Sequence, residues 1–485
     1  MVSIPYSEKK TRIVLISPPV NIGVQAGSLK DIANIIMPLG IGYVAATLKK
    51  EGFPISIIDC VPLNLTKEEL GKKVIELNPD IVAFTATIIT INATLEAARY
   101  LREILPKKTI FVIGGPQFTS LPERTMQKND FDFGILGEGE YTFLEFANAI
   151  ETGNKNYADI KSLAWYDKGK LIINPRRHFI QNLDELPLPA RELFPPLSEY
   201  TPCPGGYKRL PFAHMVTSRG CPYRCIFCDR SVFGNMFRAR SAQNVIDEIE
   251  YLVKQYGVKE IKFYDDLFTF DKKRVHAICD EIIRRDIDIT WSCSARVDSV
   301  DLELLKKMKQ AGCWQMDFGL ESGNQNILNI MKKGITLKQS EQAIRWTKKA
   351  GIRARAFIII GMPGETKESI RDTINFVKKI PLDMVTFYAL MVYPGNELYS
   401  IVQEKGGLLH EDFDHFSSLI DIKDPHLHYV PEGLTEDAIK MLIKQAYHEF
   451  YFRPSYLFRQ AIQIRGLEDI KRDWQAFFTL LKIGG

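Results

Sequence analysis

The stretch Thr-Ser-Arg-Gly-Cys-Pro-Tyr-Arg-Cys-Ile-Phe-Cys-Asp occupies residues 217–229 and follows an apolar run that predicts a strand. Within it, Cys221, Cys225 and Cys228 are separated by three and then two residues. Three thiolates this close can hold three irons of a cubane cluster, and with no fourth cysteine nearby one iron would stay open. The alternative is a zinc site, although zinc prefers four protein ligands and usually takes cysteines as two separated pairs.

The spacing of this cysteine motif, with Phe227 just before the last cysteine, resembles that of the radical S-adenosylmethionine (SAM) superfamily. The resemblance implies that Cys221, Cys225 and Cys228 are the catalytic ligands of a 4Fe-4S cluster. It also implies that the open iron binds SAM and that the cluster reduces SAM to a 5'-deoxyadenosyl radical. Phe227 is expected beside the bound SAM.

Composition and charge narrow the classes of protein that fit. The 485 residues are enough for about three domains, and the 45% hydrophobic and 25% charged content is typical of a folded soluble protein. A formal net charge of only +4, without a concentrated basic patch, argues against a nucleic-acid partner.

The cysteine count and the apolar runs bear on the compartment. Eight cysteines, three of them clustered, favour a metal site over a disulfide framework and predict a reducing environment. The N-terminus lacks a secretory pattern, and no apolar run is long enough to span a bilayer. We therefore expect a cytoplasmic protein without a transmembrane segment.

The first 150 residues alternate short apolar runs with helical patterns. Strands are predicted at residues 13–16, 55–58, 81–84, 110–113 and 133–136, and helices at 42–50, 67–77, 93–104 and 141–151. This order predicts an α/β fold with a Rossmann-like, doubly wound parallel sheet.

The carboxyl ends of these strands carry small or polar residues, at the edge where such sheets bind ligands. The candidates are Ser17, Thr85, Gly114, Gly115, Gly137, Glu138 and Gly139. No Gly-x-Gly-x-x-Gly follows the first strand, and the pattern instead resembles the cobalamin-binding domain that is fused to some radical SAM enzymes. The resemblance implies that these residues face a corrin, whereas the alternative for each glycine is ordinary turn formation.

One absence constrains the cobalamin hypothesis. Residues 1–177 contain no histidine. The Asp-x-His-x-x-Gly signature that supplies an axial imidazole in the methionine synthase type of domain is therefore missing. If cobalamin binds, no histidine from this part of the chain ligates its cobalt.

A second series of β/α units follows a predicted hairpin at residues 162–178 and a proline-rich stretch. Six strands are predicted, at residues 213–217, 260–264, 289–294, 315–319, 354–360 and 384–391, with helices between them, which favours a partial (β/α)6 barrel. We expect four parts: a cobalamin-binding domain with hairpin over 1–182, a linker over 183–210, a radical SAM barrel over 211–400 and a mostly helical region over 401–485.

The resemblance to radical SAM enzymes also implies which residues at the barrel strand ends hold SAM. Asp265, or its neighbour Asp266, stands where the superfamily often has a Gly-Gly-Glu motif that touches the SAM amino group. Helix capping or turn formation is the alternative for these two acids. Arg296 offers a bidentate fork for a carboxylate, and Glu321 can accept ribose hydroxyls or the methionine ammonium.

Two further stretches match the family near adenine. Gly361 and Gly364 belong to a Gly-Met-Pro-Gly-Glu-Thr stretch, where glycine lets the backbone approach the adenine closely. Tyr393 belongs to a Tyr-Pro-Gly-Asn stretch. Farther on, Thr435 is expected to cap a helix, and the aromatic and arginine-rich residues 447–459 form either a surface over a substrate or part of the core.

These features predict a cobalamin-dependent radical SAM enzyme. The resemblance implies a C-methyltransferase, in which a methyl group passes from SAM through methylcobalamin to an unactivated carbon of a small-molecule or lipid substrate. Oxidative cyclisation or carbon–carbon coupling is the alternative within enzymes, and a cobalamin-binding carrier or sensor with a structural metal is the alternative outside them. We expect a reductant such as flavodoxin or ferredoxin as partner.

Overall fold

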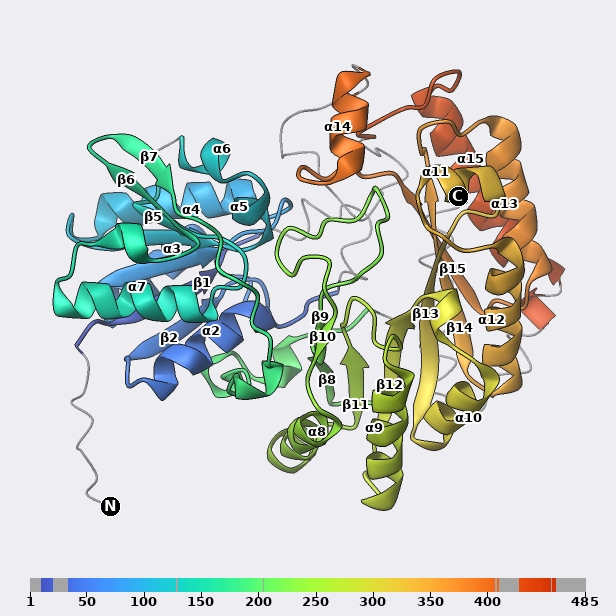
Figure 1. The fold of residues 1–485 in the computed structure, drawn as a ribbon, viewed down its shortest axis with the longest axis horizontal. Helices are drawn as coiled ribbons and strands as arrows, with labels where there is room; N and C mark the ends of the chain where they lie inside the picture. Colours follow the sequence, from blue (N-terminus) through green and yellow to red (C-terminus); the bar gives the residue numbers. More distant parts are fainter. Residues whose placement is uncertain are drawn as a thin grey trace. The chain divides into compact units, whose positions relative to one another are not determined.

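The computed structural model describes residues 10–20, 34–127, 130–203, 205–405, 408–409, 427–454 and 456–458 (Figure 1). The chain divides into two compact units. The first comprises Met1–Ile22, Ile35–Tyr200 and Arg230–Gly234, and the second comprises Gly23–Asn34, Thr201–Asp229 and Asn235–Gly485. Among the helices that the structure describes, none combines the length and the apolar character needed to cross a membrane.

A seven-stranded sheet forms the centre of the first unit, in the order β2-β1-β3-β4-β5-β6-β7. The strands are β1 (Ile13–Ser17), β2 (Ile55–Asp59), β3 (Ile81–Thr85), β4 (Ile110–Gly114), β5 (Phe133–Ile135), β6 (Leu163–Asp167) and β7 (Lys170–Ile173). The first five pair in parallel, and β6 and β7 extend the sheet as an antiparallel hairpin. The predicted doubly wound parallel sheet is therefore confirmed.

The helices of the first unit begin and end where the local sequence dictates. They are α2 (Leu39–Lys50), α3 (Lys67–Leu77), α4 (Ile91–Ile104), α5 (Pro116–Ser120), α6 (Pro122–Met126) and α7 (Glu140–Thr152). At the start of α3, Thr66 and Glu69 form a reciprocal capping box, and the helix ends at Asn78, which has a φ of 44°. In pairs, α2 packs on α7 and α3 packs on α4.

The proline-rich segment packs on the first unit as far as Tyr200. It forms three short 3-10 turns, η3 (Leu183–Glu185), η4 (Arg191–Leu193) and η5 (Leu197–Glu199). Pro189 and Phe194 lie against Gly42, where a β-carbon would stand 3.2 Å from each of them. The Tyr200 hydroxyl donates to Asp59 at 2.9 Å. The buried apolar side chains of the proline-rich segment thus fix it on the first unit, whereas the sequence predicts an extended linker.

The second unit is built on six parallel strands in the order β15-β14-β13-β12-β11-β8. They are β8 (Phe212–Met215), β11 (Glu260–Phe263), β12 (Thr290–Ala295), β13 (Cys313–Glu321), β14 (Arg353–Ile360) and β15 (Met384–Ala389). Each overlaps a strand predicted from the sequence, in agreement with a partial barrel. The structure adds a two-stranded antiparallel ribbon, β9 (Ser218–Arg219) with β10 (Arg238–Ala239).

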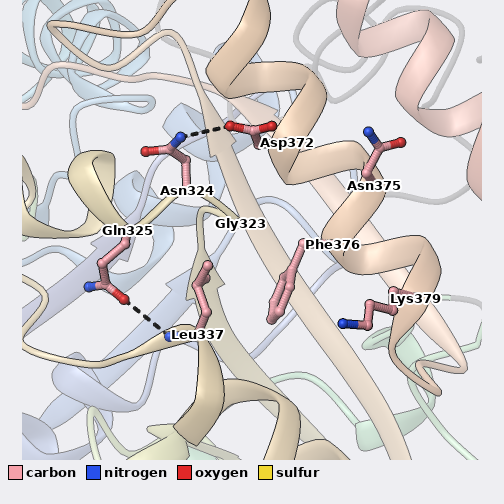
Figure 2. A pocket seen from close by; sticks show the side chains of 8 residues that line it. All are labelled: Gly323, Asn324, Gln325, Leu337, Asp372, Asn375, Phe376 and Lys379. Carbon is pink, nitrogen blue, oxygen red and sulfur yellow. Dashed lines mark hydrogen bonds between the residues drawn. The ribbon is translucent and has the colours of Figure 1, made fainter.

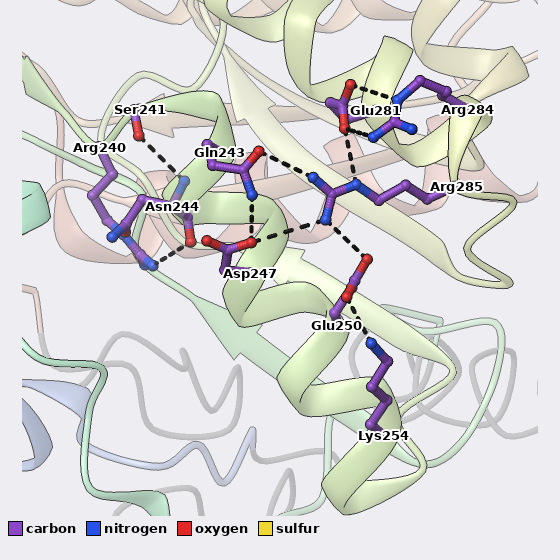
Figure 3. Close-up of polar contacts among 10 residues, drawn as sticks. All are labelled: Arg240, Ser241, Gln243, Asn244, Asp247, Glu250, Lys254, Glu281, Arg284 and Arg285. Atoms are coloured by element: carbon purple, nitrogen blue, oxygen red, sulfur yellow. Dashed lines mark hydrogen bonds and ion pairs between the residues drawn. The ribbon is translucent and has the colours of Figure 1, made fainter.

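Helices alternate with these strands along the chain. They are α8 (Ala242–Tyr256), α9 (Lys272–Arg284), α10 (Leu302–Gln310), α11 (Gln325–Ile330), α12 (Leu337–Lys349), α13 (Lys367–Lys379), α14 (Glu397–Glu404) and α15 (Glu436–Tyr451), with the 3-10 turn η6 (Val297–Ser299). Side-chain ties join neighbouring helices. Arg285, which follows α9, donates to Glu250 and Gln243 of α8 at 2.9 and 3.0 Å (Figure 3).

The open edge of the six-stranded sheet is closed by tyrosines of α15. The Tyr451 hydroxyl accepts from Val385 N at 3.0 Å and donates to Val385 O at 2.7 Å. The Tyr447 hydroxyl does the same with Phe387, at 3.1 and 3.2 Å. These hydroxyls take the place of a further strand, since edge N–H and C=O groups otherwise remain unpaired. The buried aromatic residues of this helix therefore belong to the core, one of the two alternatives that the sequence leaves open.

Candidate cofactor sites

The cysteine motif lies in a loop whose two ends are joined by the β9–β10 ribbon. Three buried groups hold the root of this loop. Arg240 N donates to Thr217 O at 3.0 Å, and the Arg240 guanidinium pairs with Glu248 of α8. The guanidinium also donates to Asn244 of the same helix (Figure 3). Arg274 Nη2 donates to Thr217 O at 2.9 Å and to Thr217 Oγ1 at 2.6 Å.

Asp265 completes the root from the end of β11. Its carboxylate accepts from Thr217 N, Thr217 Oγ1 and Ser218 Oγ, each at 2.6 Å. Asp266 accepts from Gly220 N at 3.0 Å. The two acids considered for the SAM amino group therefore hold the residues just before Cys221, and in this role they position the loop. A direct contact of Asp265 with SAM stays a prediction.

The three thiols of the motif share one electrostatic environment. Cys225 is buried, Cys221 is half-buried, and the Cys228 side chain is accessible to solvent. The pKa of Cys228 rises to about 12, because the protein around its thiol displaces part of the water that would solvate the thiolate and because Cys225, Asp266 and Cys221 add negative charge. Burial likewise raises the pKa of Cys221. Three thiolates are unfavourable here without a compensating cation.

An iron–sulfur cluster fits these residues. Its irons would supply the missing positive charge, and each of its three ligated irons takes a different thiolate. Such a cluster spreads its thiolates more widely than a single ion does. The described residues contain no group of three or more His, Cys, Asp or Glu side chains close enough to hold one metal ion. The ligand assignment of the three cysteines remains a prediction.

The loop is also held by segments that follow the barrel strands. Ile226 N donates to Met331 O at 3.1 Å, and Leu398 N donates to Ile226 O at 3.0 Å. Asn396 Nδ2 donates to Phe227 O at 2.9 Å. Phe227 thus owes its position to Asn396, the last residue of the Tyr-Pro-Gly-Asn stretch. The sequence analysis did not assign that role to Asn396.

Arg296 contacts the cysteine loop directly. Its guanidinium stacks over the Tyr223 ring, with Cζ 3.5 Å from the ring centroid, and its Nη1 lies 3.9 Å from Cys225 Sγ. Nε and Nη2 donate to Asp298 at 3.0 and 3.1 Å, and Nη2 also donates to Lys333 O at 2.7 Å. The predicted carboxylate fork is therefore occupied by Asp298. The structure places Arg296 as a positive charge beside the cysteine thiols.

Glu321 forms a buried ion pair that the sequence does not reveal. Its Oε1 accepts from Lys333 Nζ at 2.7 Å, and Lys333 Nζ also lies 5.8 Å from the centroid of the Phe227 ring. Glu321 has a φ of 63°, at a register shift between β13 and β14. A non-glycine residue in this conformation is held there by its surroundings, which is common at functional sites. Lys333 sits outside any motif.

The stretch after β14 is organised by a buried carboxylate. Gly361 and Gly364 have φ values of 104° and 84°, which explains glycine at both positions. Glu365 accepts from Gly361 N at 2.5 Å and from Met362 N at 3.0 Å, while its other oxygen has no partner in the part of the chain that the structure describes. Burial raises the pKa of Glu365 to about 7. Burial also raises the pKa of Tyr393 to about 12.

The candidate cobalamin residues lie at the carboxyl ends of the first unit's strands. The strand order reverses between β1 and β3, and doubly wound sheets bind ligands at such a switch point. Six of the candidates are partly accessible there and one, Glu138, is buried: Ser17, Thr85, Gly114, Gly115, Gly137, Glu138 and Gly139. Small, accessible groups at adjoining strand ends fit a broad ligand, and contact of each with cobalamin stays a prediction.

Contacts within the unit account for three of these residues. A β-carbon on Gly115, whose φ is 96°, would stand 2.7 Å from Ala86 O, so the backbone itself requires glycine. Glu138 accepts from Ile180 N at 2.9 Å. Ser17 hydrogen bonds to Asp59, whose pKa burial raises to about 6. Turn geometry, the alternative left open by the sequence, therefore explains Gly115 without a ligand.

A pocket of about 360 Å³ lies apart from these residues on the second unit (Figure 2). It is lined by Gly323, Asn324, Gln325, Leu337, Asp372, Asn375, Phe376 and Lys379. Its polar groups already pair within the wall, since Asn324 Nδ2 donates to Asp372 at 2.9 Å and Leu337 N donates to Gln325 at 3.2 Å. None of the residues predicted to bind a cofactor lines it.

Comparison with known proteins matches both units. Residues 215–377 match the model of the Radical SAM superfamily, and residues 28–147 match that of the B12 binding domain. An uncharacterized methyltransferase of Pyrococcus horikoshii is 34% identical over 461 residues, which cover 94% of this chain and 96% of that protein. An anaerobic magnesium-protoporphyrin IX monomethyl ester cyclase of Rubrivivax gelatinosus is 26% identical over 88% of this chain and 76% of that protein.

One solved structure shares the fold of this chain over most of the length of both proteins. It is the radical S-adenosylmethionine methyltransferase TsrM from Kitasatospora setae, with cobalamin and a 4Fe-4S cluster bound. The TM-score is 0.70 at 19% sequence identity, and the match covers 92% of this chain and 90% of that one. The order of a parallel sheet followed by a partial barrel is thus common to both.

Proposed function

Because this chain belongs to the cobalamin-binding radical SAM enzymes, we propose that it transfers a methyl group from SAM, by way of cobalamin, to an unactivated carbon of a small-molecule or lipid substrate. The observation that carries the proposal is the cysteine loop. Cys221, Cys225 and Cys228 stand on a segment that is fixed by Asp265 after β11, Arg274 of α9 and Asn396 after β15. A methyltransferase name on the Pyrococcus horikoshii relative supports the reaction class.

The chemistry of the reaction belongs to the cofactors. When bound, the cluster, SAM and cobalamin supply the electron, the hydrogen-abstracting radical and the methyl carrier, because an sp3 carbon has no acidity that a side chain could use. The chain's own residues bind these cofactors and orient the loop that carries the three cysteines. Arg274 and Arg240 fix the loop root, Asn396 holds Phe227, and the Glu321–Lys333 pair lies beside the Phe227 ring.

The test follows the methyl group. Purified, reconstituted protein would be incubated anaerobically with strong reductant, methyl-labelled SAM and a metabolite extract. We expect labelled product and 5'-deoxyadenosine to form together. If 5'-deoxyadenosine accumulates while no label reaches any product, the methyl-transfer proposal is wrong.

Oxidative cyclisation is the second candidate, and the cyclase of Rubrivivax gelatinosus favours it. The match with that protein covers 88% of this chain at 26% identity, which is lower than the 34% identity of the Pyrococcus horikoshii relative. The same experiment separates the two reactions, since cyclisation changes a substrate without adding the labelled methyl group.

The proposal also includes an electron donor and a cellular compartment. Reductive cleavage of SAM needs an electron donor, and a flavodoxin or ferredoxin is the class of protein that supplies electrons at low potential. The free cysteines Cys60, Cys279, Cys293 and Cys313 are all buried, which suits a reducing, cytoplasmic compartment.

A further inference from the structure

The six-stranded sheet has one face under helices and one face turned away from them. On β14, Ala354, Ala356 and Ile358 are fully buried, and α12 packs on that strand. The alternate residues, among them Arg355 and Phe357, remain partly accessible. Side chains alternate along a strand, so these residues lie on the inner face of the partial barrel.

Polar side chains fill two neighbouring rows of this inner face. Strand pairing places the members of each row side by side across the sheet. The first row is His214, Lys262, Ser292, Gln315 and Arg353, and the second is Ser294, Asp317 and Arg355. Barrel interiors are ordinarily filled by branched apolar side chains, so two polar rows point to a use for them.

Two cations of these rows, Arg353 and Arg355, make no ion pair with a residue that the structure describes. Lys262 Nζ pairs with Asp317 Oδ2 at 2.6 Å, across β12, where small serines leave room. Arg355 Nη2 donates to Thr386 Oγ1 at 3.1 Å. Its Nε has no partner among the described residues, and Asp317, its cross-strand neighbour, attracts it but forms its ion pair with Lys262.

Two further polar groups of the inner face are also unsatisfied. Ser292 Oγ and Gln315 Oε1 are fully buried and make no hydrogen bond to any residue that the structure describes. Buried polar atoms in native proteins nearly always have a partner. The Arg355 guanidinium lies 4.8 Å from the Phe357 ring centroid, and the Phe357 and Tyr388 rings lie 5.9 Å apart. A charged head and an aromatic wall thus adjoin on one face.

We propose that Arg355 binds a carboxylate or phosphate group of the substrate on the inner face of the barrel, with Phe357 and Tyr388 against the attached apolar part. The proposal rests on the function proposed above and narrows its substrate to an anionic one. Both oxyanions suit the planar, forked guanidinium, which pairs with them through two parallel hydrogen bonds.

The test uses the reconstituted holoenzyme saturated with SAM and cobalamin, so that the cofactor sites are occupied. Inorganic phosphate and acetate are titrated separately by calorimetry, with chloride at equal ionic strength as reference. We expect saturable binding of at least one anion, and which one binds identifies the group. In Arg355→Gln that binding should weaken roughly tenfold or more, since a charged hydrogen-bonded partner is lost.

Matched variants keep the outcome clear. Arg345→Gln removes the same charge from an exposed pair with Glu341 on α12 and should bind like the wild type. Thr386→Val removes only the hydrogen bond that orients Arg355, and should weaken binding severalfold even if Arg355→Gln folds poorly. Equal anion binding by wild type, Arg355→Gln and Thr386→Val would overturn the proposal, as would the absence of anion binding by the wild type.

A second readout separates this proposal from the proposed function. Arg355→Gln should still cleave SAM to 5'-deoxyadenosine with strong reductant, because Arg355 contacts no residue of the cysteine loop. Loss of SAM cleavage with unchanged anion binding would assign Arg355 to the cofactor instead and overturn the anion site. Failure of SAM cleavage in the wild type would count against the proposed function alone.

Discussion

At the scale of single residues, the cysteine loop holds two thiols, those of Cys221 and Cys228, whose pKa values are raised. Cys228 has a pKa of about 12 partly because Cys225 and Cys221 lie near it. Bound irons would favour the deprotonated form, since each thiol loses its proton when it ligates a metal as thiolate. The same three residues should therefore be essential for iron retention.

Replacing any of Cys221, Cys225 or Cys228 by Ala should abolish the brown absorbance of anaerobically purified protein and its formation of 5'-deoxyadenosine. Absorbance spectroscopy, iron analysis and product chromatography measure the three effects. Cys203→Ala serves as the control and should keep all three at wild-type levels. Loss of iron from the Cys203 variant would mean that the ligand set is wrong.

Glu365 predicts a pH dependence of stability. Its folded pKa of about 7 lies above the ordinary value of 4.5, because burial disfavours the charged form. The folded state thus binds more protons than the unfolded state between these values, and stability should fall as pH rises through that window, by an amount on the order of 3 kcal/mol. Glu365→Gln keeps an acceptor for Gly361 N but does not titrate.

Thermal unfolding of wild type and Glu365→Gln between pH 4.5 and 7.5 measures this effect. The melting temperature of the variant, relative to that of the wild type, should rise across the range. A constant difference between the two proteins would show that Glu365 keeps an ordinary pKa in the fold.

At the scale of elements, α15 replaces a missing seventh strand by side chains. Its Tyr451 and Tyr447 hydroxyls pair with the backbone of Val385 and Phe387 on the edge strand β15. Both tyrosines are buried, so removal of a hydroxyl leaves backbone groups unsatisfied. The cost of such a group is about 1 to 3 kcal/mol.

Tyr451→Phe should therefore lower the free energy of unfolding by that amount, as measured by denaturant titration. Tyr251→Phe is the matched control, because the Tyr251 hydroxyl makes no hydrogen bond to a described residue and its loss should change little. Equal stability of the two variants would show that the hydroxyl pairing contributes nothing to closing the sheet edge.

Several elements could be predicted from local sequence signals. Thr366 and Thr336 begin α13 and α12 by capping boxes, and the apolar periodicity gives both helices their length. The ribbon β9–β10 could not be predicted, because two-residue strands carry no periodicity. The short helix α14 was not predicted either. Lys333 and Asn396 were missed for a related reason: each reaches its partner through tertiary structure, and neither spacing nor composition marks the contact.

At the scale of the whole molecule, the first unit contains a doubly wound sheet and the second unit contains a partial barrel. The sequence predicts both, since alternating strand and helix patterns set the topology. It also constrains the cobalt site, because no histidine precedes His178. The strand-end residues from Ser17 to Gly139 could be placed at one edge by topology alone, but topology does not say which of them contact a ligand.

Electron paramagnetic resonance of bound cob(II)alamin tests the cobalt prediction. We predict that cobalamin binds with its dimethylbenzimidazole displaced from cobalt, and the first 177 residues contain no histidine to replace that base. The spectrum should therefore lack superhyperfine splitting from an axial nitrogen. Free cob(II)alamin at neutral pH, with its own base coordinated, provides the comparison spectrum. Splitting in the protein-bound spectrum would show that a nitrogen ligand reaches the cobalt.

The central claim is that one chain passes the methyl group of SAM through cobalamin and cleaves SAM at the cysteine loop. The most direct measurement incubates anaerobic, reconstituted holoenzyme with strong reductant and SAM that carries a deuterated methyl group, without substrate, and analyses the cobalamin that stays with the protein by mass spectrometry. The account predicts deuterated methyl on the cobalamin, and 5'-deoxyadenosine that disappears in Cys225→Ala. Cobalamin that is not retained, or that stays unlabelled while 5'-deoxyadenosine forms, would contradict it.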